Sequence, residues 1–245
     1  MKRMLTALTG LGLALSSAIA WASESTDVIK DPAESWEHLW AEVMLDLYIL
    51  GGIFGALAIY WLFKYKAKGP DEVGDGPTLS RGQVWGWALV PCFLFLADDL
   101  YLAANGWTAW NVYRTVPENA MEVKVTGNMW YWEFEYEDGT TSGYDVDTKE
   151  GDGLVVPVGT PVVLRMTSND VIHSFGMTKY RVKEDVMPGR ITYIWFYPKE
   201  ETETWVTCVE FCGANHSRMF APVKAVPPAK YQEWLVKRAK EEAEE

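Results

Sequence analysis

Two long apolar segments near the N-terminus constrain the fold of this chain more than any other feature. The segment from Leu47 to Phe63 carries no charged residue, and with its flanking residues it reaches the length of about 20 residues that a membrane helix needs. The segment from Val84 to Ala104 is apolar over its first two thirds and has aromatic residues near its ends, as membrane interfaces favour. We therefore predict a hairpin of two transmembrane helices, at residues 43–64 and 83–104.

The residues around these helices indicate how the chain is oriented. Residues 1–22 combine two early basic residues, an apolar run and small residues, which is the layout of a secretory signal peptide. Residues 23–42 carry six acidic residues and one lysine, whereas the loop at residues 65–82 is basic at both ends, and basic short loops stay in the cytoplasm. We expect a two-pass protein of a bacterial inner membrane, with residues 23–42 and the C-terminus on the periplasmic side.

Two carboxylates interrupt the second apolar segment. Asp98 and Asp99 lie toward its outer end, and a carboxylate inside hydrocarbon costs on the order of 2.5–3.5 kcal/mol on insertion scales. Carboxylates within a membrane are by default a functional hypothesis, which here is a proton or ion path on the outer side. The alternative is that both lie at the interface and pair with a partner subunit, and the sequence leaves these two roles open.

The pattern changes after about Trp110. Residues 111–228 contain short alternating runs broken by Gly, Pro and Asp, without helical periodicity, which is typical of a β-sandwich or barrel. Aromatic residues alternate with mostly acidic ones over residues 130–137, so one face of this strand is expected to be apolar. Residues 229–245 are expected to form a charged, solvated helix. Further strands are predicted at Leu154–Val158, Pro161–Thr167, Ile191–Tyr197 and Glu203–Thr207.

The segment CVEFCGANHSRM, residues 208–219, places two thiols, a carboxylate, an imidazole and a thioether on one short loop. A disulfide between Cys208 and Cys212 would fit the oxidising side of a membrane, but it would leave His216 and Met219 unexplained. A tetrahedral zinc site is a second alternative, although it would leave Met219 unused. A thioether selects copper rather than zinc, so the loop favours copper.

Two thiolates on one loop can bridge two copper ions if a second imidazole is available. The chain has three histidines, and His38 precedes the first membrane helix, so His173 is the remaining partner for His216. Met219 would be a weak axial ligand of one ion, and a backbone oxygen near Glu210 would serve the other. We therefore predict a dinuclear copper centre that carries electrons.

This loop resembles the Cys-x-Glu-x-Cys-Gly-x-x-His-x-x-Met loop of subunit II of cytochrome c oxidase, which holds the dinuclear copper centre CuA. Three further segments match in order, which are GNMWYWEFEY, DVIHSF and DVMPGR. The resemblance implies a two-helix membrane hairpin followed by an all-β, cupredoxin-like Greek-key domain at residues 111–228. It implies the copper ligands His173, Cys208, Cys212, His216, Met219 and the backbone carbonyl of Glu210.

The resemblance also implies partners. The centre would accept electrons from cytochrome c or a similar periplasmic donor and pass them to a haem in subunit I of a haem-copper oxidase, where oxygen is reduced. Trp130 matches the residue through which electrons enter, and the Glu210 side chain would reach a magnesium ion at the boundary with subunit I. No nucleic acid is expected as a partner. The net charge of −12 fits docking of a basic donor, as does an acidic row formed by Glu133, Glu135, Glu137 and Asp138.

Three other functions share parts of this pattern. Many family members carry a Glu at the cytoplasmic start of the second helix. This chain reads SRGQVWGWALVP there and has no carboxylate in that segment. The electron-accepting subunit of a copper-containing nitric oxide reductase is therefore an open alternative. A quinol oxidase subunit would have lost the copper ligands, all of which are present here. A membrane-anchored copper carrier would need neither the aromatic strand nor the hairpin.

Overall fold

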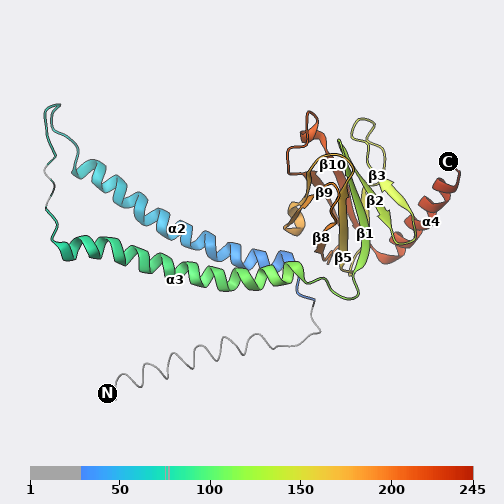
Figure 1. The fold of residues 1–245 in the computed structure, drawn as a ribbon, viewed down its shortest axis with the longest axis horizontal. Coiled ribbons are helices and arrows are strands. Elements are labelled where there is room, and N and C mark those ends of the chain that lie inside the picture. Colours follow the sequence, from blue (N-terminus) through green and yellow to red (C-terminus); the bar gives the residue numbers. More distant parts are fainter. Residues whose placement is uncertain (1–28, 75, 77, 245) are drawn as a thin grey trace, which may run out of the picture. The chain divides into compact units, whose positions relative to one another are not determined.

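The computed structural model describes residues 29–74, 76 and 78–244, so the signal peptide predicted at residues 1–22 lies outside the described residues. Two long helices come first, α2 (Pro32–Lys64) and α3 (Arg81–Arg114). They pack against each other and lie side by side in Figure 1. Both are long and apolar enough to cross a membrane. Each extends beyond the predicted membrane span, α2 toward the N-terminus and α3 toward the C-terminus.

Side chains at the start of each helix explain where the helix begins. The Asp31 carboxylate accepts a hydrogen bond from the backbone N–H of Ala33, and Pro32 occupies the first helical position, where its missing N–H has no cost. Ser80 and Gln83 form a reciprocal capping box at the start of α3. These caps satisfy backbone donors that the helix itself leaves free.

The β-domain consists of two five-stranded sheets that enclose one apolar core. Figure 1 labels most of its strands. The first sheet has the strand order β3 (Thr141–Gly143), β2 (Tyr131–Tyr136), β1 (Met121–Asn128), β5 (Val162–Ser168) and β8 (Thr192–Phe196). The second has the order β4 (Leu154–Pro157), β10 (Phe220–Val226), β9 (Thr202–Cys208), β6 (His173–Met177) and β7 (Val182–Val186). Two short 3₁₀ turns, η2 (Thr178–Tyr180) and η3 (His216–Arg218), interrupt the loops. The predicted fold class is confirmed.

Alternation along β2 gives the first sheet its buried face. Trp132, Phe134 and Tyr136 are buried, whereas Tyr131 and Glu133 are exposed. Burying a large apolar side chain contributes about 1.5–3 kcal/mol, so this face supplies much of the driving force for packing the sheets. The hydroxyl of Tyr136 accepts a hydrogen bond from the backbone N–H of Val155 at 2.9 Å, which links the first sheet to β4 of the second.

Four strands were not predicted from the sequence, namely β3, β6, β7 and β10. All five residues of β6 are buried, so the strand shows no alternation, and short runs of this kind give no periodic signal. β10 contains Pro222, and a proline argues against an interior strand. β3 is only three residues long. Tertiary packing, rather than local pattern, therefore determines these elements.

The sequence predicts a solvated helix at the C-terminus. The observed helix α4 (Pro228–Glu244) instead packs one side against the β-domain. Tyr231 belongs to the core, and Trp234 packs against it with its ring centroid 5.1 Å from that of Tyr136. The Trp234 indole N–H also donates to Asp152 at 2.7 Å. The expectation overlooked aromatic residues spaced one turn apart in a segment dominated by charge, and these residues anchor the helix to the domain.

Candidate metal centre

The candidate metal centre is built from two neighbouring strands and one loop of the second sheet. His173 is the first residue of β6, and Cys208 is the last residue of β9. The two strands are antiparallel neighbours, with Phe175 opposite Cys208. The loop from β9 to β10 then carries Cys212, His216 and Met219. Sheet pairing therefore brings together a histidine and a loop that are far apart in the sequence.

Two sulfur atoms form the middle of this site. The Sγ atoms of Cys208 and Cys212 are 3.7 Å apart, well beyond the roughly 2.05 Å of a disulfide bond, and both cysteines are free. The Nδ1 atom of His173 lies 3.9 Å from the sulfur of Cys208, and the Nδ1 atom of His216 lies 3.6 Å from the sulfur of Cys212. Each sulfur therefore has one imidazole nitrogen facing it.

Two weaker donors complete the arrangement. The Met219 thioether sulfur lies 3.8 Å from the sulfur of Cys212, and the backbone carbonyl oxygen of Glu210 lies 3.2 Å from the sulfur of Cys208. The Glu210 side chain itself is exposed. The structure thus brings the predicted ligand groups around a pair of sulfurs, with one weaker donor beside each sulfur.

Burial and charge at this site match a soft metal. His173, Cys208, Cys212 and Met219 are all buried, and the ligand atoms of the first three lie within 4.8 Å of one another. Burial and the neighbouring thiol of Cys208 raise the pKa of Cys212 to about 12. A metal that binds here must displace a proton from this thiol. Thiolate, thioether and imidazole donors together select copper, so the residues fit a copper centre.

Backbone contacts hold the loop in this shape. The N–H of Cys208 donates to the carbonyl of Met219 at 2.9 Å, and the N–H of His216 donates to the carbonyl of Gly213 at 3.1 Å. Gly213 has a φ of 118°, a conformation open mainly to glycine. Its Cα faces the Trp130 ring, and a Cβ there would meet Trp130 Nε1 at 3.3 Å. The loop therefore closes tightly against Trp130.

Trp130 lies in the turn before β2 and does not belong to the buried face of that strand, which Trp132, Phe134 and Tyr136 form. The side chain is half-buried, and its indole N–H donates to the backbone carbonyl of Cys212 at 3.2 Å. The alternation with Trp132 therefore does not continue to Trp130. One edge of this ring reaches a predicted metal ligand, while the rest faces a surface pocket.

This surface pocket has a volume of about 430 Å³. Its acidic members are Asp145 and Asp147, and Asp147 forms an ion pair with Arg218. The sequence analysis did not identify these two acids as site residues, although YDVDTKEGD is a concentrated acidic stretch. The remaining lining includes the aromatic side chains of Trp130, Tyr131 and Tyr144.

The predicted acidic docking row extends away from this pocket along β2, and most of its members have local partners. Glu135 pairs with Lys124 at 2.6 Å. Glu137 accepts a hydrogen bond from the backbone N–H of Glu122 at 3.0 Å. Asp138 accepts one from the N–H of Thr140, also at 3.0 Å. Only Glu133, which is exposed, lies near the Trp130 end of the strand.

The two carboxylates that were predicted to lie in the membrane are on α3, in different surroundings. Asp98 is half-buried and Asp99 is exposed. Nearby on α3, the Tyr101 hydroxyl donates to the Glu42 carboxylate of α2 at 2.9 Å. Glu42 in turn lies 3.6 Å from Nδ1 of His38. Polar side chains therefore join the two helices at this level, and the role of Asp98 and Asp99 stays a prediction.

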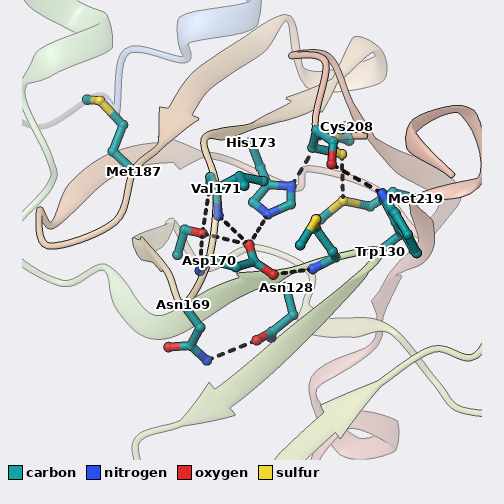
Figure 2. Close-up of polar contacts among 12 residues, drawn as sticks. Asn128, Trp130, Asn169, Asp170, Val171, His173, Met187, Cys208 and Met219 are labelled. Atoms are coloured by element: carbon teal, nitrogen blue, oxygen red, sulfur yellow. Dashed lines mark hydrogen bonds and ion pairs between the residues drawn. The ribbon is translucent and has the colours of Figure 1, made fainter. Parts of the chain in front are cut away.

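Asp170 is a residue of the site that the sequence analysis missed. Its Oδ1 atom lies 2.8 Å from Nε2 of His173, a contact marked by a dashed line in Figure 2. Its Oδ2 atom accepts a hydrogen bond from the N–H of Met129 at 2.6 Å. Burial alone would raise the pKa of Asp170, but the hydrogen bonds from His173 and Met129 outweigh it and lower that pKa. An acid three residues before a predicted histidine ligand was the available signal.

Comparison with known proteins gives a consistent result. A family model described as "Cytochrome C oxidase subunit II, periplasmic domain" matches residues 139–226. Cytochrome c oxidase subunit 2 of Cereibacter sphaeroides is 31% identical, over 94% of this chain and 91% of the relative. The alternative cytochrome c oxidase subunit 2 of Bradyrhizobium diazoefficiens is 29% identical, over 83% of this chain and 81% of the relative. Among solved structures, the periplasmic domain of subunit II of the cytochrome oxidase of Bradyrhizobium japonicum is 29% identical over 52% of this chain and 99% of that one, with a TM-score of 0.48.

Proposed function

Because this chain belongs to the cytochrome c oxidase subunit 2 family, we propose that its β-domain takes electrons from a periplasmic donor and passes them to a haem in subunit I. Cytochrome c or a similar small protein is the proposed donor, and oxygen is the proposed terminal acceptor. The observation that carries this proposal is the pair of sulfurs 3.7 Å apart, each faced by one imidazole Nδ1. The hairpin of α2 and α3 would anchor the β-domain on the periplasmic face of the inner membrane.

The residues that would hold two copper ions are His173, Cys208, Cys212, His216, Met219 and the carbonyl of Glu210. When bound, copper held by these donors would supply reversible one-electron transfer without making or breaking bonds to a substrate. His173 and Cys208 lie on paired strands and are buried, so the protein fixes these two donors whether or not an electron is present. A donor set that does not rearrange suits rapid electron transfer.

Trp130 is the proposed point where electrons enter. Its half-buried ring is accessible from the pocket, and its N–H contacts the carbonyl of Cys212 at 3.2 Å. The residue therefore connects the protein surface to the backbone of a predicted ligand through one hydrogen bond. The alternative is that Trp130 is only a core residue. It would then be expected to be as buried as Trp132, which is 0% exposed, whereas Trp130 is only half-buried.

The pocket beside Trp130 is the proposed contact for a basic donor. Asp145 and Asp147 are its acids, and the negative charge of the chain would attract a positively charged partner over longer range. Because Glu135, Glu137 and Asp138 have local partners, the predicted acidic row would act mainly through this general field, and Glu133 would remain the member nearest the contact. Electrostatics of this kind raise the association rate more than the affinity.

Two further assignments come from the family. The exposed Glu210 side chain is proposed to reach a magnesium ion at the boundary with subunit I, while its carbonyl faces the sulfur of Cys208. A nitric oxide reductase remains the second candidate function, since Gln83 stands near the start of α3, where many oxidases carry a Glu. The Gln83 side chain there accepts a hydrogen bond from the N–H of Ser80 at 2.9 Å.

Stopped-flow kinetics on the assembled complex would test this function. Reduced cytochrome c is mixed with the complex, and reduction of the subunit I haem is followed, for the normal chain and for a Cys208→Ser, Cys212→Ser double variant. We expect the variant to lose haem reduction by cytochrome c but to keep reduction by a small artificial reductant. Equal haem reduction by cytochrome c in both proteins would contradict the proposal. Consumption of oxygen against nitric oxide by the same complex distinguishes the two acceptors.

A further inference from the structure

Asp170 contacts two different parts of the site with its two carboxylate oxygens. Oδ1 lies 2.8 Å from Nε2 of His173, as the dashed line between these labelled residues in Figure 2 marks. Oδ2 accepts a hydrogen bond from the N–H of Met129 at 2.6 Å. We propose that Asp170 is a positioning residue that couples the imidazole of His173 to the turn carrying Trp130. The inference rests on the proposed function, because it concerns the path from the point where electrons enter to the metal ligands.

The contact to His173 determines which ring nitrogen is free. An ionised carboxylate only accepts hydrogen bonds, so in the neutral imidazole the contact selects the tautomer in which Nε2 carries the proton and Nδ1 keeps its lone pair. Nδ1 is the atom that faces the sulfur of Cys208 at 3.9 Å. Partners of this kind fix the tautomer and orientation of a ligand histidine. Asp170 therefore prepares His173 for a metal before any metal binds.

The packing around the ring leaves His173 little freedom to rotate. The side chain is 0% exposed, and its ring lies edge-on to Trp132, with centroids 5.8 Å apart. On another side lies Gly127, where a Cβ would meet Cδ2 of His173 at 3.0 Å. The ring is thus confined by packing, and its remaining polar contact, other than with the sulfur, is with Asp170.

The contact to Met129 acts on Trp130 through one peptide unit. Asp170 holds the backbone immediately before Trp130, and Cys212 holds the other end of the same residue through the indole N–H at 3.2 Å. The contacts close a ring that runs from Asp170 through His173, the two sulfurs and Trp130 back to Asp170. A change in the position of Trp130 is therefore transmitted to the imidazole of His173, and a change in the position of His173 is transmitted to Trp130.

A neighbouring contact offers a matched control. The Asn169 side chain donates to the Asn128 side chain at 2.9 Å, which ties the same loop to the end of β1 without touching His173 or Met129. If Asp170 only fastens this loop, loss of the Asn169 contact should have similar effects. If Asp170 couples the two groups, its loss should have effects that Asn169→Ala does not reproduce.

The first test uses the metal-free, full-length chain in detergent, labelled with ¹⁵N at histidine and methionine. The tautomer of His173 and the hydrogen exchange of the Met129 amide are measured for the normal chain, Asp170→Ala and Asn169→Ala. We expect Asp170→Ala to lose the pure Nε2–H tautomer and to speed exchange at Met129 by on the order of tenfold, and Asn169→Ala to keep both. An unchanged signal at either residue in Asp170→Ala, or the same loss in Asn169→Ala, would overturn the proposal.

A second variant keeps the test valid if Asp170→Ala does not fold. Asp170→Asn retains one accepting oxygen, so it should lose one of the two signals and keep the other; retention of both would overturn the coupling. Neither measurement needs copper, so failure of the inference is distinguishable from failure of the proposed function. In the loaded complex, Asp170→Ala should also raise the reduction potential of the centre, because a negative charge beside it is removed. An unchanged potential would count against a direct contact with the ligand set.

Discussion

The indole N–H of Trp130 donates a hydrogen bond to the backbone carbonyl of Cys212 at 3.2 Å. One residue is half-buried beside a surface pocket, and the other contributes a buried sulfur to the candidate metal centre. This contact joins a residue of the pocket lining to the backbone of a predicted metal ligand, and we therefore predict that electron transfer to the centre depends on Trp130.

Trp130→Phe should slow reduction of the centre by cytochrome c while leaving metal content unchanged. Phenylalanine keeps an aromatic ring but lacks the N–H that contacts Cys212. We expect a decrease in rate of at least about tenfold, equivalent to about 1.4 kcal/mol of barrier, measured by stopped-flow absorbance. Tyr131→Phe is the control, since Tyr131 lines the same pocket and is exposed; an equal decrease in both variants would argue against a specific role for Trp130.

Asp147→Asn should raise the KM for a basic donor more than Glu137→Gln does. Asp147 forms an ion pair with Arg218 at the pocket, so its loss leaves an uncompensated positive charge facing the donor. Glu137 lies beyond the other end of β2 from Trp130. We expect a rise of about two- to fivefold for Asp147→Asn, smaller at high salt, in steady-state assays. If Glu137→Gln has the larger effect, the acidic row rather than the pocket forms the contact.

Gly127→Ala should destabilise the domain and disturb the His173 ring. A Cβ at residue 127 would lie 3.0 Å from Cδ2 of His173 and 3.2 Å from Cζ3 of Trp132, and overpacking of this kind costs about 1–3 kcal/mol. Urea unfolding of the full-length chain measures the loss. Gly143→Ala is the comparison, because its Cβ would meet only the Trp132 carbonyl oxygen, at 3.4 Å. Similar losses in the two variants would mean that the approach to His173 has no special cost.

Tyr136 should make the domain less stable at alkaline pH. Burial raises the pKa of its phenol above the ordinary value, which is about 10. The unfolded chain therefore loses its proton first, so stability is complete below about pH 10 and decreases as the pH rises further. Tyr136→Phe should show a shallower decrease in urea titrations at increasing pH. It should also be less stable at pH 7, because the Val155 N–H loses its acceptor; a slope equal to that of the normal chain would contradict this assignment.

The features that sequence reasoning predicted are those that local pattern specifies. The length of the apolar segments predicted the membrane-type helices, and alternation predicted strands such as β2 and β5. The spacing in CVEFCGANHSRM indicated which donors would share a site, because few chemistries use two thiols, an imidazole and a thioether within one loop.

The features that were missed depend on tertiary contacts. β6 is buried on both faces and shows no period, so only its pairing with β7 and β9 reveals it. Asp170 belongs to the site because folding brings Met129 and His173 to its two oxygens. The acidic row was assigned a docking role, but Lys124 and nearby backbone N–H groups, which no pattern identifies, already contact most of it.

The central claim is that Cys208 and Cys212 hold two copper ions between them, and metal analysis combined with electron paramagnetic resonance tests it most directly. The full-length chain is purified in detergent, loaded with copper, and compared with Cys208→Ser and Cys212→Ser variants. We predict two copper ions per chain that share one unpaired electron, with that signal lost in either variant. One copper ion with a single-ion spectrum, or zinc in place of copper, would contradict the claim.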